Sequence, residues 1–488
     1  MIALRTVETL SGGEWVTSAA SGAWIDVHDP SDVRTPLARV PALTAKEVTR
    51  AYEHAERAFT AWKRTSPFER ARIFTDAARL IRERLDEIAA DVTAENGKTV
   101  AEARGETLKA ADFLDYYAGL ARQGYGTLLH DVRPDHRTHT QREPIGVILV
   151  ISPWNDPLIT PARKLAPLLA TGNTAVFKPA TETPLAGLHF ARALHDAGLP
   201  AGVLNVVTGR TAEIEEALLD DARMAAVTFT GSNAVGARIR RRLADRGVRF
   251  QGELGGKNAS VVLADADLPA AAKAVVAASF GQAGQRCTAT SRVVVDRSAY
   301  EEFMRLLTAE VDALTVGPGN DPSTTVCPLS SPRQRDSVLA DIGRAIEQGA
   351  TVVTGGTAET EGERAHGCYV QPTVLADVTA DMAVWREEVF GPVLAVCAVD
   401  GFTEAVEVVN DSAFGLAAAV FTRDITAAYR FADEVECGQV AVNTTTTGWD
   451  VHLPFGGFRD SGTGYKEQGD EVLRFSTRVK TVAVHFGA

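Results

Sequence analysis

The sequence predicts an α/β fold with two units, each a parallel sheet covered by helices, and a small β segment beside them. Three observations support this prediction. The chain has 488 residues, 45% of them hydrophobic and 23% charged, which is more than one core usually spans. Short apolar runs alternate with helix-like segments between residues 145 and 232, and the alternation returns after residue 258. Such alternation is typical of parallel sheets with helices on their faces.

The first unit begins with a helical cover and continues with the strands of its sheet. Residues 44–125 are rich in Ala, Glu, Arg and Leu at helical spacing, and TAKEV at its start fits a capping box. The strands expected next are IGVILVIS, TAVFKPA, VLNVVTG and MAAVTFTG. The helices expected between them are TPARKLAPLLATG, PLAGLHFARALHDAG and AEIEEALLDD.

The second unit repeats this pattern after GELGGKN, and two other segments interrupt it. Its expected strands are ASVVLADADL, TSRVVVD, TVVTGG, GPVLAVCAV, LAAAVFT and QVAVN, with helical stretches such as YEEFMRLLTAEVDAL between them. Residues 128–146 and the tail STRVKTVAVHFG alternate like exposed edge strands. Edge strands are usually covered, so we expect both segments to pair with something.

The composition indicates a globular protein of a reducing compartment. The five cysteines are dispersed, with no CxxC pair and no Cys/His spacing of the zinc type, so we expect a cytoplasmic protein without a metal site. The N-terminus lacks the apolar core of a signal peptide, and no apolar run approaches the roughly 18 residues of a membrane span. A net charge of −13 repels polyanions, and the basic cluster at 237–246 fits a solvated helix face. We therefore expect neither nucleic acid nor membrane as a partner.

Two segments are candidates for a cofactor site. In VTFTGSNAVGARI a strand runs into a helix through Thr230, Gly231 and Ser232, and a helix N-terminus offers free N–H groups to a pyrophosphate. The spacing is not GxGxxG, so the glycines also fit a purely packing role. In FKPATETP, Lys178 ends a strand, where its ammonium could reach ribose or phosphate or could simply be solvated.

Three residues suit thiol chemistry. Cys287 could attack a carbonyl if a helix dipole or the adjacent Arg286 favoured its thiolate, although a lone cysteine is more often inert. Glu253 lies among glycines that permit close approach, as a general base acting through water requires, and it could instead cap a turn. Asn155 follows a buried strand, where its amide could donate to an oxyanion or form an Asx turn.

Seven motifs occur in one order along the chain: PWNDP, FKPA, FTGS, ELGGKN, GQRC, EEVFGPV and PFGG. With them the sequence resembles the aldehyde dehydrogenase superfamily essentially end to end. The resemblance implies a Rossmann-like NAD(P)-binding domain at 1–127 and 147–253, an α/β catalytic domain at 254–443, and oligomerisation segments at 128–146 and 466–488. It also implies a homodimer or homotetramer that acts on a small-molecule aldehyde.

The same resemblance assigns roles to individual residues. Cys287 would attack the aldehyde carbon, and Asn155 with the Cys287 backbone N–H would hold the oxyanion. Hydride would pass to the nicotinamide, and Glu253 would activate the water that hydrolyses the thioester. Glu253 argues against the branch that transfers the acyl group to coenzyme A. Lys178 matches a catalytic and ribose-binding position, and the other implied cofactor residues are Trp154, Gly231, Ser232, Glu388 and Phe390.

One departure from the family pattern concerns the cofactor. Many members have a glutamate that binds the adenosine ribose at the position of Thr181, and here the acid falls one residue later, at Glu182. Loss of that carboxylate removes repulsion toward a 2′-phosphate. The sequence therefore predicts that NADP is accepted as well as NAD.

The substrate is the second question. The tail TTTTGWDVHLPFGGFRDSGTGYKEQG and GQRCTATSR look most like the branch that oxidises α-ketoglutaric semialdehyde (2,5-dioxopentanoate). Arg163 matches a carboxylate-binding arginine of relatives that act on acidic semialdehydes, with Arg286 and Phe455 as further pocket residues. A second arginine of those relatives is Gly281 here. Two alternatives stay open: a dehydrogenase of neutral or aromatic aldehydes in which Arg163 pairs with an acid, and a non-enzymatic protein with a retired dehydrogenase fold.

Overall fold

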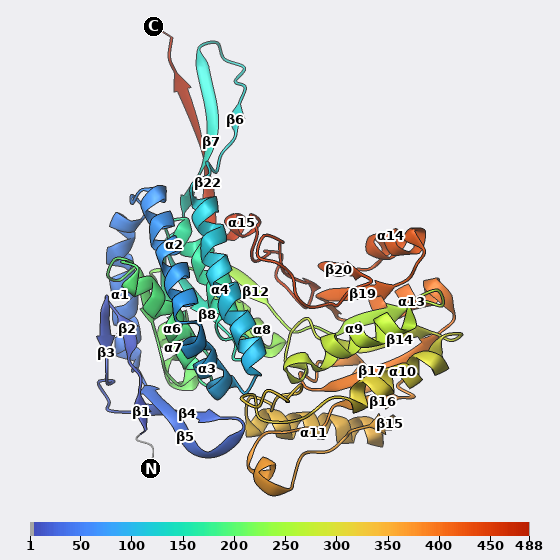
Figure 1. Ribbon diagram of the computed structural model, residues 1–488. Helices are drawn as coiled ribbons and strands as arrows, with labels where there is room; N and C mark the ends of the chain where they lie inside the picture. Colours follow the sequence, from blue (N-terminus) through green and yellow to red (C-terminus); the bar gives the residue numbers. More distant parts are fainter. Residues whose placement is uncertain (1–3, 488) are drawn as a thin grey trace.

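Two parallel sheets organise the chain, and a computed structural model describes residues 4–487 (Figure 1). The first sheet has five parallel strands in the order β10-β9-β8-β11-β12. Their bounds are β8 (Val147–Ile151), β9 (Thr174–Lys178), β10 (Leu204–Val206), β11 (Met224–Thr230) and β12 (Arg249–Glu253). The strand order reverses between β8 and β11, and ligands bind at such a reversal, beyond the carboxyl ends of the strands.

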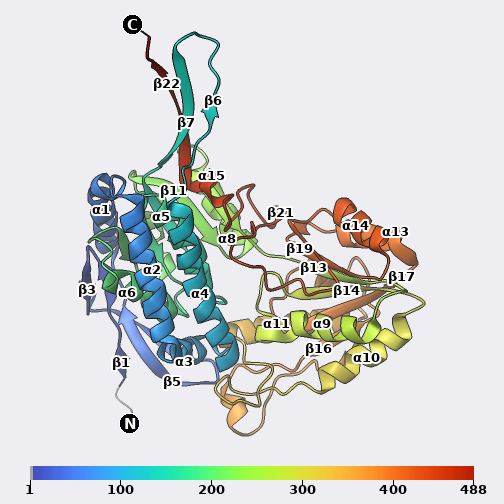
Figure 2. The same cartoon turned by 45° about the horizontal axis from the view of Figure 1, so that its top comes forward.

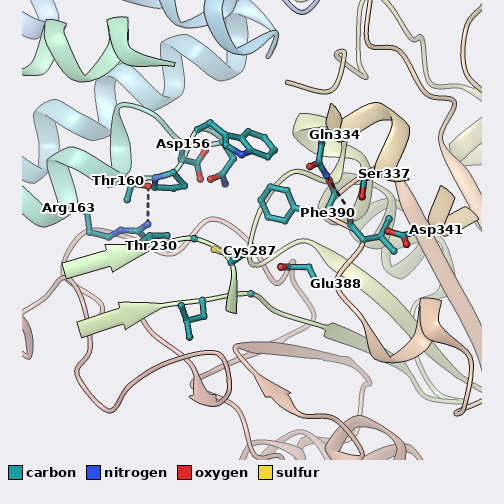
Figure 3. A pocket seen from close by; sticks show the side chains of 18 residues that line it. Asp156, Thr160, Arg163, Thr230, Cys287, Gln334, Ser337, Asp341, Glu388 and Phe390 are labelled. Carbon is teal, nitrogen blue, oxygen red and sulfur yellow. Dashed lines mark hydrogen bonds between the residues drawn. The ribbon is translucent and has the colours of Figure 1, made fainter. Parts of the chain in front are cut away.

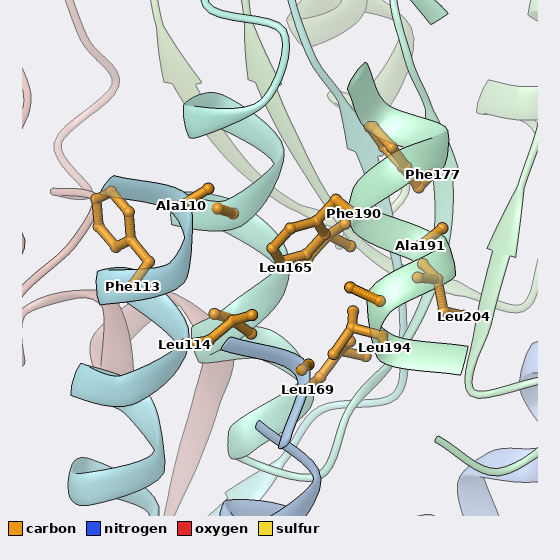
Figure 4. Close-up of a cluster of buried hydrophobic side chains, with 14 of the residues drawn as sticks. Ala110, Phe113, Leu114, Leu165, Leu169, Phe177, Phe190, Ala191, Leu194 and Leu204 are labelled. Atoms are coloured by element: carbon orange, nitrogen blue, oxygen red, sulfur yellow. The ribbon is translucent and has the colours of Figure 1, made fainter. Parts of the chain in front are cut away.

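Helices cover both faces of this sheet, which explains why its strands other than β12 are largely apolar. The helices are α1 (Ala45–Trp62), α2 (Pro67–Glu83), α3 (Leu85–Asn96), α4 (Val100–Ala121), α5 (Ile159–Ala170), α6 (Pro184–Asp196), α7 (Thr211–Leu219) and α8 (Asn233–Leu243). Figure 4 shows Leu114 of α4, Leu165 of α5 and Phe190 of α6 in the core on one face. The predicted capping box is present, since Glu47 accepts a hydrogen bond from the Thr44 N–H at 2.8 Å.

The second sheet has seven strands in the order β15-β16-β17-β14-β13-β19-β20. Only the β15/β16 pair is antiparallel. The strands are β13 (Asn258–Val262), β14 (Thr290–Asp296), β15 (Thr351–Thr354), β16 (Thr373–Ala376), β17 (Val393–Val399), β19 (Ala417–Phe421) and β20 (Gln439–Val442). The helices are α9 (Leu268–Phe280), η1 (Gly281–Gly284), α10 (Tyr300–Asp312), α11 (Pro332–Glu347), η2 (Gly362–His366), α12 (Ala383–Arg386), α13 (Gly401–Asn410) and α14 (Ile425–Glu434).

A three-stranded antiparallel arm projects from the body of the protein, as Figures 1 and 2 show. Its central strand β7 (His136–Pro144) pairs with β6 (Leu128–Leu129) and, over nine residues, with β22 (Thr477–His485). The two segments that interrupt the sequence pattern are therefore strands that pair with each other. Between them and the body, α15 (Val472–Ser476) packs into the core of the first unit, so the projecting part of the tail starts only at β22.

The predicted α/β fold class is confirmed, and several strands lie outside the prediction. At the N-terminus these are β1 (Arg5–Thr6), β2 (Thr9–Ser11), β3 (Glu14–Val16), β4 (Trp24–Asp29) and β5 (Asp32–Pro41). The others are β12, β16, β18 (Phe414–Gly415) and β21 (Phe458–Arg459). Within residues 4–487, no helix has the length and apolar character needed to cross a membrane.

Candidate active site

A cavity of about 280 Å³ lies where the first sheet faces the second unit. Its walls come from the carboxyl ends of β8 and β11, the start of α5, the Cys287 loop, α11 and the loop after α12. Figure 3 shows Cys287 near the centre, with Arg163 to its left and Glu388 and Phe390 to its right. The lining includes these sequence-predicted residues: Trp154, Asn155, Arg163, Gly231, Ser232, Cys287, Glu388 and Phe390.

Cys287 lies in the loop between η1 and β14, and its carbonyl accepts a hydrogen bond from Asn258 Nδ2 at 2.8 Å. Burial raises the pKa of the Cys287 thiol to about 12, although the Arg163 guanidinium acts in the opposite direction. The cation that favours its thiolate is therefore Arg163, and not Arg286 as the sequence suggested. Arg286 Nε donates to Gln282 Oε1 at 2.9 Å, and Arg286 lies outside the lining of the cavity.

Asn155 is 5% exposed and follows β8, with part of its side chain in the cavity wall. Its Nδ2 donates to the Gln285 carbonyl at 2.9 Å. A primary amide has two N–H groups, so one remains for an oxyanion formed on a substrate bound to Cys287.

Glu253 ends β12 and is 2% exposed. Gln251 Nε2 donates to Glu253 Oε1 at 3.0 Å, while the buried Oε2 has no hydrogen-bond partner among the described residues. Burial, and then the negative charge of Glu467, raises the Glu253 pKa well above its ordinary value. Gly456 packs on this carboxylate at φ +146°, and a Cβ there would lie 2.5 Å from Oε1, so only glycine fits. Glu253 itself lies outside the cavity lining, but its charge acts on the Cys287 thiol and raises the pKa of that thiol.

The other half of the cavity suits a dinucleotide. Ser232 caps α8, and the buried Thr230 Oγ1 has no partner among the described residues. Glu388 Oε1 accepts from the Gly256 N–H at 2.8 Å, and a Cβ on Gly255 would lie 2.4 Å from Glu388 Oε2. Burial raises the Glu388 pKa to about 7, against the lowering effects of that N–H and a nearby lysine.

Two aromatic rings close the cavity above these groups. Trp154 and Phe390 meet edge to face, with ring centroids 5.3 Å apart. Phe390 has φ +58°, an uncommon backbone conformation for a residue with a Cβ, and such conformations concentrate at functional sites.

Lys178 and Thr181 lie outside this cavity. Lys178 is 3% exposed at the end of β9, and its Nζ donates to the Pro179 carbonyl at 3.1 Å. Burial lowers its pKa to about 8, opposed by the Glu182 carboxylate. Thr181 Oγ1 is 3.5 Å from the Gly209 carbonyl, at the wall of a second cavity of about 320 Å³ that Glu182 also lines.

Arg163 projects from α5 into the cavity, and Glu467 and Phe455, which lie outside the cavity lining, contact its side chain. Its Nε is 2.9 Å from Glu467 Oε2 in an ion pair that is not aligned as a hydrogen bond. Its guanidinium lies over the Phe455 ring at 4.5 Å, so Phe455 supports Arg163 and does not line the cavity. Lys164 Nζ pairs with the other oxygen of Glu467, so two cations share one buried carboxylate.

Several residues of the site were not singled out from the sequence. Asp156 lines the cavity beside Asn155, and its signal was the one ionisable residue of the motif PWNDP. Lys164 and Glu467 had no local signal, because they are 303 positions apart in the sequence. Within residues 4–487, no cluster of His, Cys, Asp or Glu side chains could hold a metal ion.

The site combines a cysteine and an amide donor in one cavity with a buried carboxylate close by, which are the groups that oxidation of an aldehyde through a thioester requires. The model of the aldehyde dehydrogenase family matches residues 15–482. The chain therefore belongs to this family and is an NAD(P)-dependent aldehyde dehydrogenase.

Three curated relatives illustrate the range of similar proteins. α-Ketoglutaric semialdehyde dehydrogenase of Bacillus subtilis is 41% identical over 97% of this chain and 96% of its own. α-Ketoglutarate semialdehyde dehydrogenase of Haloferax volcanii is 42% identical over 96% of this chain and 97% of its own. Phenylacetaldehyde dehydrogenase of Pseudomonas fluorescens is 39% identical over 98% of this chain and 96% of its own.

Solved structures agree with this fold and with both cofactors. Betaine aldehyde dehydrogenase of Staphylococcus aureus in complex with NAD⁺ is 31% identical, with a TM-score of 0.95 over 99% of this chain and 95% of its own. A 3,6-anhydro-L-galactose dehydrogenase in complex with NADP is 34% identical, with a TM-score of 0.94 over 98% of this chain and 99% of its own. The cofactor of this family is NAD or NADP. Three features of the site fit such a cofactor: the Thr230 hydroxyl, which has no partner among the described residues, the N-terminus of α8, and Gly255, whose lack of a side chain leaves room beside Glu388.

Proposed function

We propose that this enzyme oxidises a semialdehyde with a distal carboxylate, such as α-ketoglutaric semialdehyde, to the corresponding acid. The observation that carries the proposal is that Arg163 lines the same cavity as Cys287. A guanidinium fork suits recognition of a carboxylate. Two relatives above 40% identity are named for this substrate.

The charges around Arg163 favour an anion. Arg163 and Lys164 share the single carboxylate of Glu467, so this carboxylate alone does not neutralise both cations. The ion pair engages Nε of Arg163, while an NH2 group reaches only Thr160 Oγ1 at 3.4 Å. Donor capacity therefore remains on the cavity side for a substrate carboxylate.

The proposed chemistry starts at Cys287. With a thiol pKa of about 12, attack on the aldehyde carbon requires that the proton leave Cys287 as the S–C bond forms. That proton can pass to solvent water. Glu253, whose raised pKa makes its ionised form a stronger base than an ordinary carboxylate, acts later, on the water that hydrolyses the thioester. Asn155 Nδ2 and the Cys287 backbone N–H would stabilise the alkoxide of the thiohemiacetal.

The bound nicotinamide would supply the hydride acceptor that converts this adduct to a thioester. Gly231, Ser232, Glu388, Phe390 and Trp154 would hold the cofactor, with Lys178 and Thr181 at its adenosine end. Glu253 would then take a proton from the water that hydrolyses the thioester, since its Oε2 has free acceptor capacity.

A second candidate is oxidation of neutral or aromatic aldehydes. The Arg163–Glu467 pair and the Phe455 ring behind it would then be structural, as the alternative from the sequence requires. The relative named for phenylacetaldehyde is nearly as similar as the semialdehyde relatives. The other alternative, a non-enzymatic protein, is set aside because the chain belongs to an enzyme family.

Substrate preference separates the two candidates. We expect α-ketoglutaric and succinic semialdehydes to exceed neutral aldehydes of equal length by about ten- to a hundredfold in kcat/KM, because a charge-assisted hydrogen bond contributes about 1.5–3 kcal/mol. Arg163→Met should remove this preference and spare neutral substrates, whereas Arg286→Met, outside the cavity, should leave it unchanged. A wild-type preference for hexanal or benzaldehyde would reject the acidic substrate.

We also propose that the enzyme is a homodimer or homotetramer assembled through the arm. β22 is an edge strand of the arm, and the arm exposes Leu128, Val132 and Val479 at 70%, 101% and 55%. An apolar edge of this kind is normally covered by another chain. The division into an NAD(P)-binding domain (1–127, 147–253), a catalytic domain (254–443) and oligomerisation segments (128–146, 466–488) is part of this proposal. So is a cytoplasmic location, which the five free thiols support.

A further inference from the structure

A buried polar segment connects α3 to α4 and lies against the loop that carries Asn155. Its sequence, residues 95–99, is ENGKT. The side chains of Glu95, Asn96 and Lys98 are each 1% exposed. Burying such groups costs free energy unless each finds a partner. Their partners therefore show what the segment holds in place.

Lys98 contacts three acceptors, one for each N–H of its ammonium. Nζ donates to a carboxylate oxygen of Glu106, to the backbone carbonyl of Asn155 at 2.9 Å and, more weakly, to Asp156 Oδ1 at 3.4 Å. Burial alone would lower the Lys98 pKa, but Glu106 and Asp156 outweigh burial and hold the pKa above its ordinary value. Lys98 is therefore a charged group whose donors are all engaged on this loop and on Glu106.

Glu106 binds the same loop a few residues after Asn155. Its Oε1 accepts from the N–H groups of Leu158 and Ile159 at 2.8 and 3.0 Å, where α5 begins. From the opposite side, Gln282 Nε2 donates to the Asn155 carbonyl. Gln282 has φ +53° in the turn that precedes Cys287. The Asn155 carbonyl thus links the α3–α4 segment to the nucleophile loop.

These contacts determine where the Asn155 side chain can be. Both lone pairs of its carbonyl are engaged, and one amide N–H is tied to the Gln285 carbonyl. The remaining N–H has little freedom of direction. Stabilisation of an oxyanion depends on that direction, because the donor must meet the charge as it develops.

We propose that Lys98 is a positioning residue, which fixes the backbone of Asn155 and thereby aims the amide that binds the oxyanion. This proposal rests on the proposed role of Asn155. Lys98 lies outside the lining of the cavity, so it would act through Asn155 and not on the substrate.

The test needs a variant that removes the donor without leaving a buried unpaired charge. Lys98→Met alone would leave Glu106 uncompensated, which destabilises the fold. Lys98→Met with Glu106→Gln avoids this, because the glutamine Oε1 can still accept from the α5 N–H groups. Lys98→Gln with Glu106→Gln keeps an amide donor and serves as the conservative variant. Lys109 lies on the same helix as Glu106 and forms a partly exposed ion pair with Asp450, so Lys109→Met is the matched control.

The measurement is a double-mutant cycle with Asn155→Ala on the burst rate and kcat. Asn155→Ala alone should lower kcat by about 100- to 1000-fold. Lys98→Met/Glu106→Gln should lower kcat about tenfold in the wild type, since a displaced catalytic group costs of this order, and less than about twofold in the Asn155→Ala background. Cofactor Kd should stay within about twofold, the Gln variant should recover part of the loss, and Lys109→Met should match wild type.

The outcomes distinguish a failure of the positioning role of Lys98 from a failure of the proposed role of Asn155. A full tenfold loss in the Asn155→Ala background would show that Lys98 acts independently of Asn155, which overturns the positioning role. Equal losses for the Met and Gln variants would also overturn it, because the donor would then be irrelevant. A normal kcat for Asn155→Ala would instead reject the proposed role of Asn155 itself, and the inference with it.

Discussion

Glu253→Gln is the sharpest test of the proposed chemistry. In the native site Gln251 Nε2 donates to Glu253 Oε1, so the amide oxygen of a glutamine would occupy that position. Its NH2 group would then replace Oε2, the oxygen without a partner among the described residues. The variant exchanges this proton acceptor for a donor and changes almost no volume. It should therefore leave acylation by Cys287 largely intact and block hydrolysis of the thioester.

The size of the defect follows from the role of a general base. Such a base contributes about 10²- to 10⁴-fold, or about 2.7–5.4 kcal/mol of barrier. The neighbouring carboxylate of Glu467 cannot substitute, because Arg163 and Lys164 already hold it. Stopped-flow absorbance should show a burst of one reduced cofactor per active site, then turnover slowed by at least about a hundredfold. An unchanged steady-state rate would refute the role of Glu253.

The pH dependence of the stability of the same variant tests the raised pKa of Glu253 independently of activity. Burial raises the pKa of Glu253 well above the ordinary 4.5, so the folded protein binds a proton more tightly than the unfolded chain. That stability is complete below about pH 4.5 and is lost as pH rises toward the folded pKa. Glutamine does not titrate, so the melting temperature of Glu253→Gln relative to wild type should increase with pH. A difference independent of pH would mean that folding does not shift the Glu253 pKa.

Three further predictions concern the nucleophile, the cofactor and the arm. Cys287→Ala should abolish aldehyde oxidation yet keep cofactor affinity in a fluorescence titration, and substantial remaining turnover would exclude Cys287 as nucleophile. Wild type should use NADP at least as well as NAD, and Thr181→Glu should raise KM for NADP selectively by like-charge repulsion; equal effects on both cofactors would place Thr181 away from the ribose. Light scattering should find a dimer or tetramer at assay concentration, and a stable, active monomer would contradict assembly through the arm.

The sequence predicted strands best where each strand was a continuous run of apolar residues. β8, β9, β11, β13 and β17 are apolar runs because helices cover both faces, and each lies where the pattern placed it. β12 was missed because RFQGE has no such run. Its polar residues Gln251 and Glu253 are buried and hydrogen-bonded to each other. Because these positions hold polar residues, β12 lacks the apolar run by which the other strands were recognised.

The residues of the site that belong to motifs were predictable from the sequence, and the residues that hold them in place were not. Asn155, Glu388 and Cys287 were placed by ordered motifs, and all three line one cavity. The contacts that hold them join distant positions, which periodicity does not detect. No sequence pattern singled out Lys98, which is buried and donates a hydrogen bond to the Asn155 carbonyl. The direction of Arg286 likewise depends on Gln282, whose left-handed backbone no pattern indicates.

The arm also bears on how this enzyme is best handled at the bench. Strand β22 runs outward, so its carboxyl end lies toward the far tip of the arm, whereas β1 lies at the opposite end of the molecule (Figure 1). The last turn of chain is tied down as well, because the Phe486 N–H donates to the Asp135 carbonyl at 2.9 Å. A purification tag fused to the C-terminus would start where a neighbouring subunit is proposed to pack. A tag fused to the N-terminus would leave that surface free, so paired tagged versions would reveal interference with assembly before any crystal is grown.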